Sequence, residues 1–579
     1  MISLTIDGVK VEVPDNTSVL EAARAANIKI PTLCYLKGVN AIGACRMCLV
    51  EMIEGGRGLQ ASCVLPAANG MVISTKSKAV QDARRVNLEL ILSNHDKRCL
   101  SCVRNRNCEL QTVCEELGVE DVPYEGQSFD RPLDTGSASV VRDPNKCILC
   151  RRCVAVCNNV QKIGAIGATE RGFKTTVEPV FGKSLKDVPC VNCGQCITAC
   201  PVGALTEKSE IQNVWDAIND STKHVVVQTA PAVRFGLGEE FGIPVGTSVT
   251  GKMATALRRI GFDKVFDVDF SADLTIMEEG TELLGRIKNG GKLPMITSCS
   301  PGWIKYCEHF FPDFLDNLSS CKSPHQMGGA VIKSYYAQKA GIDPKDIYVV
   351  SIMPCTAKKF EKERDEMAVN GNRDVDAVLT TRELAKMIKQ ANIDFKNLPD
   401  SDFDRVLGES TGAAVIFGAT GGVMEAALRT VADLLTGEDL KEINYECVRG
   451  IDGVKEATIN VADMDIKVAV ASGTGNAKRL LEAIRNGEKE YHFIEVMGCP
   501  GGCVTGGGQP IVSAQDKLSI NPYVLRAKAT YAEDSGKPKR KSHENEELQL
   551  LYKEFLGEPN SHKAHELLHT HYHARPKYK

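Results

Sequence analysis

Two cysteine-rich stretches dominate this sequence: residues 147–157, which read CILCRRCVAVC, and residues 190–201, which read CVNCGQCITACP. Both have the spacing CxxCxxCxxxC. The chain holds 23 cysteines in 579 residues, and most of them are separated by only two or three residues. In a chain of this length such spacing is typical of thiolates grouped around a metal, whereas disulfide frameworks are typical of small secreted domains. The sequence therefore predicts several metal centres.

The two stretches resemble the paired runs of bacterial two-cluster ferredoxins. In those proteins three cysteines of one run and the fourth cysteine of the other run ligate the same 4Fe-4S cluster. The resemblance implies that one cluster is ligated by Cys147, Cys150, Cys153 and Cys200. It implies that a second cluster is ligated by Cys190, Cys193, Cys196 and Cys157. We place this two-cluster ferredoxin domain at residues 138–209.

The region before this domain begins with a hairpin pattern, SLTIDGVKVEV (residues 3–13), whose strands alternate around Asp7 and Gly8. A helical pattern, TSVLEAARAANI (17–28), follows it. Four thiolates suit a 2Fe-2S cluster, although a zinc site is the alternative. The four cysteines are Cys34, Cys45, Cys48 and Cys63. Their layout resembles plant-type ferredoxins with altered spacing, so we expect a β-grasp 2Fe-2S domain over residues 1–78.

A histidine and three cysteines follow, behind an amphipathic helix pattern, AVQDARRVNLELILSNH (79–95). They are His95, Cys99, Cys102 and Cys108. One imidazole with three thiolates is a common zinc set. Directly after a ferredoxin-like domain, however, this spacing resembles the His-ligated 4Fe-4S module of iron hydrogenases and of the large iron-sulfur subunit of respiratory complex I. We place the module at residues 79–118 and interpret Cys114 as a buried or bystander thiol.

The composition excludes several classes of protein. With 43% hydrophobic residues, 25% charged residues and a net charge of −4, the chain resembles an ordinary globular protein and has no electrostatic basis for binding nucleic acid. No apolar stretch approaches the roughly 18 to 20 residues needed to span a bilayer. Asp7 and Lys10 interrupt any signal-peptide core. We therefore expect no membrane association and a cytoplasmic location.

Beyond residue 223, short apolar runs alternate with helical patterns such as GKMATALRRIGF (251–262), which favours an α/β domain. A chain of this length is expected to form three or more domains, so the whole is a multidomain α+β and α/β protein. The runs expected to form strands are HVVVQTAPAV (224–233), KVFDVDF (264–270), KLPMITSC (292–299), DIYVVSIMPC (346–355), AAVIFGATGG (413–422) and HFIEV (492–496).

Three segments of this half carry cysteines behind such a run: TSCSPGW with Cys299, MPCTAKKFE with Cys355, and EVMGCPGGCVTGGGQP with Cys499 and Cys503. Their thiols are predicted to meet at strand ends in one buried pocket. The segments resemble the three signatures of the FeFe-hydrogenase catalytic domain. The order of modules resembles clostridial-type five-cluster enzymes and the catalytic subunit of NAD(P)-linked hydrogenases. The resemblance implies a catalytic domain at 223–515 and a small-subunit-like helical tail at 516–579.

The resemblance implies an H-cluster, a 4Fe-4S cube joined by a thiolate to a two-iron unit that carries CO, cyanide and a dithiolate with a central amine. Cys355 and Cys499 would ligate the cube, and Cys503 would ligate it and bridge to the two-iron unit. Lys358 would donate a charge-assisted hydrogen bond to an iron-bound cyanide. The residues implied around the other diatomic ligands are Ala230, Pro231, Pro354, Met353 and Met497. For the two methionines, core packing is the alternative.

The implied reaction is the reversible conversion of H2 into two protons and two electrons, with one 2Fe-2S and three 4Fe-4S clusters carrying the electrons. The implied proton path runs in the order Cys299, Glu282, Ser319, Glu279 and Arg286. The two glutamates and the arginine are three and four residues apart, so they share one side of a helix. An ordinary solvated helix face is the alternative, and spacing does not decide between the two.

The chain departs from the family in the first signature, which usually reads TSCCP. Ser300 stands where the second cysteine would ligate the cube. A serine alkoxide is a hard ligand and forms less readily than a thiolate. Either Ser300 ligates and Cys299 relays protons, or a backbone shift lets Cys299 ligate while Ser300 or water relays protons. Ala232 and His325 replace the serine and glutamine that are usual near the cyanides.

The expected electron partner is ferredoxin or a flavin-containing NAD(P)-binding subunit. With the second partner, the chain would be the catalytic subunit of an NAD(P)-dependent, electron-bifurcating complex. GATGG (418–422) and GGGQP (506–510) lie inside catalytic segments, so we find no glycine-rich dinucleotide loop after a strand. Nicotinamide chemistry would therefore need a partner, and maturation proteins would supply the two-iron unit. The alternatives to an enzyme are a hydrogen sensor and an iron-sulfur electron-transfer or assembly protein.

Two features carry no motif. Cys307, Cys321 and Cys447 are expected to be buried thiols. The histidine-rich segment HKAHELLHTHYHARPKYK (562–579) is expected to be a helix surface followed by a basic tail, although adventitious metal binding is an alternative.

Overall fold

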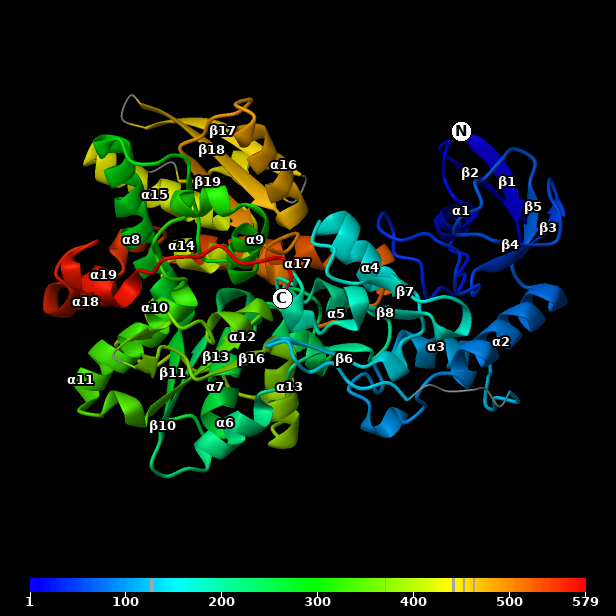
Figure 1. The fold of residues 1–579 in the computed structure, drawn as a ribbon, viewed down its shortest axis with the longest axis horizontal. Helices are drawn as coiled ribbons and strands as arrows, with labels where there is room; N and C mark the ends of the chain where they lie inside the picture. Colours follow the sequence, from blue (N-terminus) through cyan, green and yellow to red (C-terminus); the bar gives the residue numbers. More distant parts are fainter. Residues whose placement is uncertain (125–129, 370, 440–442, 451–452, 462–463, 579) are drawn as a thin grey trace.

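The computed structural model describes residues 1–124, 130–369, 371–439, 443–450, 453–461 and 464–578. Figure 1 shows the N-terminal modules at one end of the molecule and a larger α/β body at the other. The described residues of the larger body form two four-stranded sheets, one in its upper and one in its lower half in this view, and the small pair β14-β15. The predicted multidomain α+β and α/β organisation is therefore confirmed.

The first module folds around a five-stranded sheet in the order β2-β1-β5-β3-β4. The predicted hairpin is confirmed, because β1 and β2 pair antiparallel and the chain turns at Asp7 and Gly8 with φ of 50° and 84°. The predicted helix is α1, which begins after Ser18, whose side chain accepts a hydrogen bond from Glu21 N. The elements are β1 (Ile2–Ile6), β2 (Val9–Val13), α1 (Val19–Ala25), β3 (Leu49–Glu54), β4 (Leu59–Ala61) and β5 (Val72–Ser74).

The next two modules contain short elements connected by loops. The predicted amphipathic helix is α2, which buries Val80, Leu88 and Leu92 on one face. In the following domain β6 pairs with β9 and β7 pairs with β8. The elements are α2 (Lys78–Ser93), α3 (Glu109–Glu116), β6 (Val140–Arg142), α4 (Arg152–Ala155), β7 (Gly167–Thr169), β8 (Thr176–Glu178), α5 (Gln195–Ala199) and β9 (Leu205–Glu207).

The lower sheet of the larger body consists of four parallel strands in the order β11-β10-β13-β16. Its strands are nearly continuous runs of buried apolar residues, as in parallel sheets covered on both faces. The elements of this part are α6 (Ile211–Ile218), β10 (His224–Thr229), α7 (Thr250–Ile260), β11 (Lys264–Asp267), α10 (Pro324–Val331), α11 (Ala337–Ala340), β13 (Ile347–Met353), α12 (Ala357–Glu361), β14 (Ala368–Val369), β15 (Asn372–Arg373), β16 (Ala377–Thr380) and α13 (Thr381–Gln390).

The upper sheet has the order β12-β19-β18-β17, in which only β17 runs antiparallel to its neighbour. The long helix α8 contacts β10 of the lower sheet and α15, which itself contacts β19 of the upper sheet. The elements here are α8 (Val268–Asn289), β12 (Met295–Ile296), α9 (Pro301–Phe310), α14 (Gly412–Val415), α15 (Gly422–Thr436), β17 (Val454–Val461), β18 (Met464–Ser472), α16 (Thr474–Arg485) and β19 (Phe493–Met497).

The C-terminal segment forms three helices, as predicted for the tail. They are α17 (Pro522–Gly536), α18 (Glu546–Leu551) and α19 (His562–Leu568). Helix α17 packs on α14, α18 packs on α8, and α19 packs on α10. From α19 the chain runs back across the larger body toward its centre (Figure 1). The tail therefore wraps the catalytic half of the chain.

Several expectations for this half were wrong. HVVVQTAPAV is strand only to Thr229, and Pro231–Val233 forms a 3-10 turn. AAVIFGATGG is helical: it forms α14 and a 3-10 turn over Ile416–Gly418. The strand prediction was wrong because the segment is fully buried, and a short apolar run does not distinguish a buried strand from a buried helix. KVFDVDF is strand only to Asp267, whose side chain caps α8 by accepting from Asp269 N. Cys447 is exposed, since it lies in a surface turn whose inward-facing residue is Val448.

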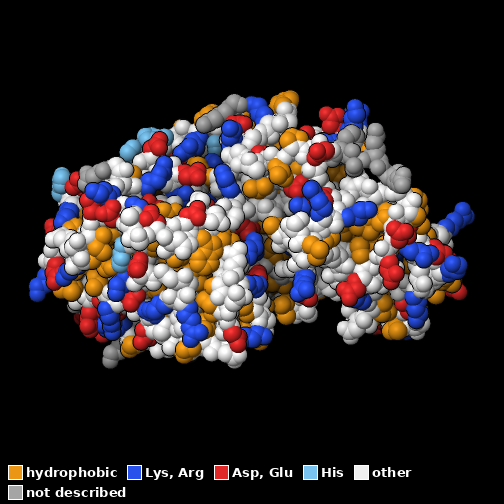
Figure 2. All heavy atoms as spheres, turned by 90° about the horizontal axis from the view of Figure 1, so that it is seen from below, with side chains coloured by type: hydrophobic (Ala, Val, Ile, Leu, Met, Phe, Trp, Pro, Cys, Tyr) orange, Lys and Arg blue, Asp and Glu red, His pale blue; other side chains and the backbone are white. Residues whose placement is uncertain are grey.

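The surface is of mixed charge. Figure 2 shows acidic and basic side chains interspersed over one face, as expected for a net charge of −4. None of the helices in the described part of the chain is long and apolar enough to cross a membrane.

Candidate functional site

Two cavities in residues 138–209 are each lined by four cysteines. One cavity is lined by Cys147, Cys150, Cys153 and Cys200. The other is lined by Cys157, Cys190, Cys193 and Cys196. Each cavity thus combines three thiols of one run with the fourth thiol of the other run. This is the grouping that the two-cluster resemblance implies.

The backbone around these cavities has an unusual conformation. Leu149 and Arg151 in the first run, and Asn192 and Gly194 in the second, have φ between 55° and 69°. Alternation of left-handed and right-handed residues turns successive N–H groups toward one side and creates a concave site for an anion. Leu149 N, for example, lies 3.4 Å from Cys147 Sγ. Such loops suit a negatively charged iron-sulfur cluster.

The N-terminal thiols also gather. Cys34, Cys45, Cys48 and Cys63 are all buried, and the Cys34 thiol interacts with those of Cys45 and Cys63. In the next module, His95 Nδ1 is buried and has no hydrogen-bond partner among the described residues. A buried imidazole nitrogen without a partner is costly unless a metal or another group fills the position. Cys99, Cys102, Cys108 and Cys114 are all partly exposed.

A further cavity lies between the two sheets of the larger body. Strands β12, β13 and β19 end at it, so the prediction that the three signatures meet at strand ends is confirmed for Cys299, Cys355 and Cys503. Among the other wall residues are Ala230, Pro231, Ser300, His325, Met353, Pro354, Lys358, Phe417 and Met497. Cys499 is buried next to this wall, where its thiol interacts with those of Cys355 and Cys503. Ala232 is buried but is not part of the wall.

Cys299 and Ser300 point to different neighbours. The Ser300 hydroxyl accepts a hydrogen bond from Gly498 N at 3.1 Å, directly before Cys499. The Cys299 side chain is only partly exposed, and burial first and then the charge of Glu279 raise the pKa of its thiol well above the usual value. The hydroxyl therefore lies on the side of the cysteines, and the thiol on the side of α8.

A buried ion pair forms one end of the cavity. Lys358 Nζ donates to Glu361 Oε2 at 2.9 Å, to Ser323 Oγ at 2.8 Å and to Cys299 O at 3.1 Å. Burial alone would raise the pKa of Glu361, but Lys358 and the hydrogen bond from His325 hold it at about 2. The Nδ1 of His325 lies 2.8 Å from the same carboxylate, whereas its buried Nε2 has no partner among the described residues.

The predicted order of the proton path is wrong for the two glutamates. Glu279 is the carboxyl that neighbours Cys299. Glu282 instead accepts from Ser319 Oγ at 2.8 Å and from Arg286 Nη2 at 2.6 Å. The order in the structure is thus Cys299, Glu279, Ser319, Glu282 and Arg286. Spacings of three and four residues place the groups on one face of α8 but do not say which end of the face meets the cavity.

The Glu279 carboxyl is not part of a solvated helix face. It is 1% exposed, and burial, followed by the charge of Glu282, raises its pKa to about 8. Because the Ser319 hydroxyl donates to Glu282, neither oxygen of Glu279 has a hydrogen-bond partner among the described residues. A buried carboxyl with this pKa is protonated at neutral pH and suits proton transfer.

Comparisons with known proteins agree with this geometry. Family models described as "Iron only hydrogenase large subunit, C-terminal domain" and "Iron hydrogenase small subunit" match residues 223–507 and 521–575. The model "2Fe-2S iron-sulfur cluster binding domain" matches 1–78. The models "NADH-ubiquinone oxidoreductase-G iron-sulfur binding region" and "NADH-quinone oxidoreductase subunit 3, ferredoxin-like domain" match 84–123 and 137–206.

Similar proteins extend over the whole chain. "NADP-reducing hydrogenase subunit HndD" of Solidesulfovibrio fructosivorans is 52% identical over 99% of both chains. "Iron hydrogenase 1" of Clostridium pasteurianum is 44% identical over 99% of this chain and 100% of its own. The chain belongs to the iron-only hydrogenase family. A solved [FeFe]-hydrogenase HydA1 from Chlamydomonas reinhardtii is 43% identical and covers 64% of this chain and 100% of its own, with a TM-score of 0.58.

As an iron-only hydrogenase, the protein interconverts H2 with protons and electrons at an H-cluster, and 2Fe-2S and 4Fe-4S clusters carry the electrons. The central cavity fits such a cofactor. Its walls combine three thiols and an ammonium group, and it presents the unpartnered Nε2 of His325. The hydrogenase signatures thus surround a site with thiols at one side and polar donors at the other.

Several residues of the hydrogenase site were missed in the sequence. Glu361 pairs with both Lys358 and His325, and Ser323 accepts from Lys358. Glu361 is three residues after Lys358 on α12, so the i, i+3 spacing was an available signal. Ser323 had no comparable signal, because its contact with Lys358 spans 35 residues.

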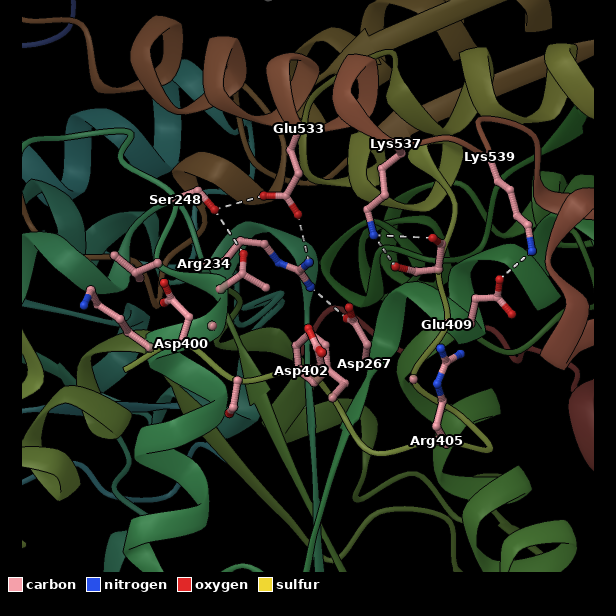
Figure 3. Close-up of a pocket in the computed structure, with 18 of the residues that line it drawn as sticks. Arg234, Ser248, Asp267, Asp400, Asp402, Arg405, Glu409, Glu533, Lys537 and Lys539 are labelled. Carbon is pink, nitrogen blue, oxygen red and sulfur yellow. Dashed lines mark hydrogen bonds and ion pairs between the residues drawn. The ribbon is translucent and has the colours of Figure 1, made fainter. Parts of the chain in front are cut away.

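A larger cavity of about 780 Å³ lies elsewhere in the hydrogenase, between α7, residues 400–410 and the end of α17 (Figure 3). Its charged groups largely neutralise one another. Arg234 pairs with Asp267 and Glu533, and Lys539 pairs with Glu409. No signature residue of the family lines it, so the chemistry belongs to the central cavity in spite of the greater volume here.

Proposed function

We propose that Cys355, Cys499, Cys503 and Ser300 would hold the cube of the H-cluster, and that Cys503 would also hold the two-iron unit. The observation that carries this proposal is the cavity in which the signature thiols, Ser300 and Lys358 meet. Ser300 is favoured over Cys299 because its hydroxyl lies beside Gly498, next to Cys499. Cys299 then remains available to relay protons.

The bound cofactor supplies the chemistry that breaks or forms the H–H bond. The apolar wall residues, Met353 and Met497 among them, exclude water from it. Lys358 holds a positive charge at the wall, and one of its three present hydrogen bonds would be exchanged for one to a cyanide. Cys299 would pass a proton to or from Glu279, and Ser319 would connect Glu279 with Glu282 and Arg286.

The infrared spectrum of the maturated protein tests the assignment of the site. We expect CO and cyanide bands, and their absence would remove the proposal.

The choice between the two cube ligands is tested by Cys299→Ala. If Ser300 ligates, the variant keeps its cube iron and loses H2 turnover, whereas loss of cube iron would identify Cys299 as the ligand.

We also propose one 2Fe-2S cluster on the four N-terminal cysteines, one 4Fe-4S cluster on His95, Cys99, Cys102 and Cys108, and two in the ferredoxin domain. The thiol of Cys499 is 3.8 Å from the carbonyl of Cys193, so a ligand loop of the ferredoxin domain touches a ligand of the H-cluster. This contact supports electron entry through that domain. Iron and acid-labile sulfide counts on single-module variants test the number of clusters.

The electron partner that we propose is a flavin-containing, NADP-binding subunit. The support is the 52% identity, over 99% of both chains, with a protein named as a subunit of an NADP-reducing hydrogenase. Ferredoxin is the second candidate, since the chain is also 44% identical to an iron hydrogenase of a Clostridium. H2-dependent NADP reduction that requires an added flavoprotein would support the first candidate, and equal rates with ferredoxin alone would favour the second.

A further inference from the structure

Three side chains with metal-binding atoms meet beside the proton path. One carboxylate oxygen of Glu282, the thiol of Cys321 and one ring nitrogen of His569 all lie within 4.8 Å of one another. The thiol lies 3.9 Å from Glu282 Oε2, which is the oxygen that accepts the hydrogen bond from Ser319. The proposed reaction uses Glu282 but gives no role to Cys321 or His569.

The backbone holds two of these groups opposite each other. Cys321 and His569 form an antiparallel bridge between residues 320–322 and 568–570, and backbone hydrogen bonds of 2.7 Å hold it on either side. Side chains directly opposite in such a pair have Cβ atoms about 4.5 to 5.5 Å apart on the same face. Their proximity therefore comes from the chain path, and both residues are buried.

The hydrogen bonds of His569 leave its Nδ1 as the nitrogen for a metal. Its Nε2 lies 3.1 Å from Glu278 Oε2, and its Nδ1 lies 2.8 Å from Ser320 Oγ. Glu278 is fully buried and also accepts from Tyr552. The Glu278 carboxylate can only accept, so Nε2 must carry the proton. Nδ1 then has a lone pair, which accepts a hydrogen bond from the Ser320 hydroxyl. Histidines that bind metals usually donate their other N–H to a carboxylate in this way.

We propose that Glu282, Cys321 and His569 bind a divalent cation of the Zn²⁺ or Cd²⁺ type, and that the bound cation stops proton transfer by occupying Glu282. An imidazole, a thiolate and a carboxylate are ligands that zinc accepts, and a fourth position remains for water. Binding releases the thiol proton to solvent, and the two anionic ligands then balance the charge of the cation. The site does not depend on the proposed function, but its effect on turnover rests on the proposed proton path.

Cadmium binding to the holoenzyme tests the site. After incubation with Cd²⁺ and desalting, elemental analysis should find one bound cadmium that is absent from Cys321→Ala. Cys447→Ala, which removes an exposed thiol, should keep it. Glu278→Gln retains all three ligands but loses the carboxylate behind His569, so binding should weaken about 10- to 100-fold. Cys321→Ser replaces the alanine variant if the latter does not fold.

Equal cadmium content in wild type and Cys321→Ala would overturn the site and identify binding elsewhere, for example at His571 and His573, whose rings lie 4.8 Å apart.

The effect on turnover is measured as the rate relative to each variant's own metal-free rate. Half-inhibition should need at least about 10-fold more Cd²⁺ in Cys321→Ala. Infrared bands that stay unchanged with Cd²⁺ show that the H-cluster is intact. Binding without inhibition would keep the site and overturn the role of Glu282 in proton transfer.

Discussion

The hydroxyl of Ser319 donates a hydrogen bond to Glu282 Oε2 at 2.8 Å, and this bond joins the buried part of the proposed proton path to its outer part. Ser319→Ala removes the hydroxyl and should lower H2 evolution about 100-fold, the lower end of what positioned proton-transfer groups contribute. The cyanide and CO bands should remain. Ser334→Ala, in which the lost hydroxyl only bonds Ala330 O, is the control. Equal rates in both variants would remove Ser319 from the path.

The ionisation of Glu279 can be followed directly. Burial first, and the charge of Glu282 second, raise its pKa to about 8, so its carboxyl is protonated below that pH and loses the proton above it. Infrared difference spectra should show a carboxylic C=O band that disappears as the pH rises through about 8. The band should be missing in Glu279→Gln. In Glu282→Gln it should disappear at a lower pH, and an unchanged midpoint would contradict the coupling of the two carboxyls.

Substitutions at position 300 should separate ligation from packing. Ser300→Cys supplies a softer ligand and should retain the cube with a changed reduction potential. Ser300→Ala removes the ligand and should lower the cube iron content measured after maturation. Ser298→Ala is the matched control, because the Ser298 hydroxyl donates to Cys321 O rather than facing the cysteines. Full cube iron in Ser300→Ala would show that another group completes the ligation.

A buried ion pair joins the ferredoxin domain to the catalytic domain. Arg382 of α13 donates to Glu207 of β9 at 2.7 Å, and both side chains are under 10% exposed. Burial opposes ionisation of Glu207, but the charges of Arg382 and Lys386 hold its pKa below the usual value. Arg382→Met leaves the carboxylate buried with only Lys386, and should cost about 3 to 5 kcal/mol.

Hydrogen exchange at the amides of β9 and α13 measures this loss. Lys386→Met is the comparison variant, because the Lys386 side chain is 39% exposed and lies 3.3 Å from Glu207, so its loss should cost less than that of Arg382. Because the folded pKa of Glu207 is lowered, its stabilising effect is present above the unfolded pKa of about 4.3 and is lost as the pH falls toward the folded value. In Arg382→Met this acid dependence should be weaker. Equal exchange in wild type and Arg382→Met would contradict the role of the pair.

Lys305 places a buried charge beside the proposed second ferredoxin cluster. Its Nζ donates to Asn192 Oδ1 at 3.0 Å, between the proposed ligands Cys190 and Cys193, and burial lowers the pKa of Lys305 to about 8. A nearby positive charge favours the reduced, more negative state of a cluster. Lys305→Met should therefore lower the reduction potential of that cluster, measured by EPR-monitored titration. Lys345→Met, at the surface, should leave it unchanged.

The parts that could be predicted from the sequence depend on local spacing. The cysteine runs place their thiols a few residues apart, so the grouping of Cys147, Cys150 and Cys153 required no knowledge of distant contacts. The hairpin at Asp7 and Gly8 and the helix α2 were predicted for the same reason. The ligand roles themselves stay predictions.

The parts that could not be predicted depend on contacts between distant segments. The order of Glu279 and Glu282 was wrong because it is set by the packing of α8 against β10 and α15, which its own sequence does not encode. The burial of His569 was missed because its partners, Glu278 and Ser320, lie about 250 to 290 residues earlier in the chain. The strand prediction for AAVIFGATGG was wrong because complete burial removes the polar residues that reveal a helical or strand period.

The bridge between Cys321 and His569 also has a consequence for biosynthesis. A ribosome must add 249 residues after Ser320 before His569, its hydrogen-bond partner, exists. Domains generally fold from the N-terminus as they are made. The ferredoxin-like modules can therefore fold while the wall around Glu282 is still incomplete. We therefore expect closure of that wall to come last, so that the electron-carrying half is assembled before the route by which protons leave is complete.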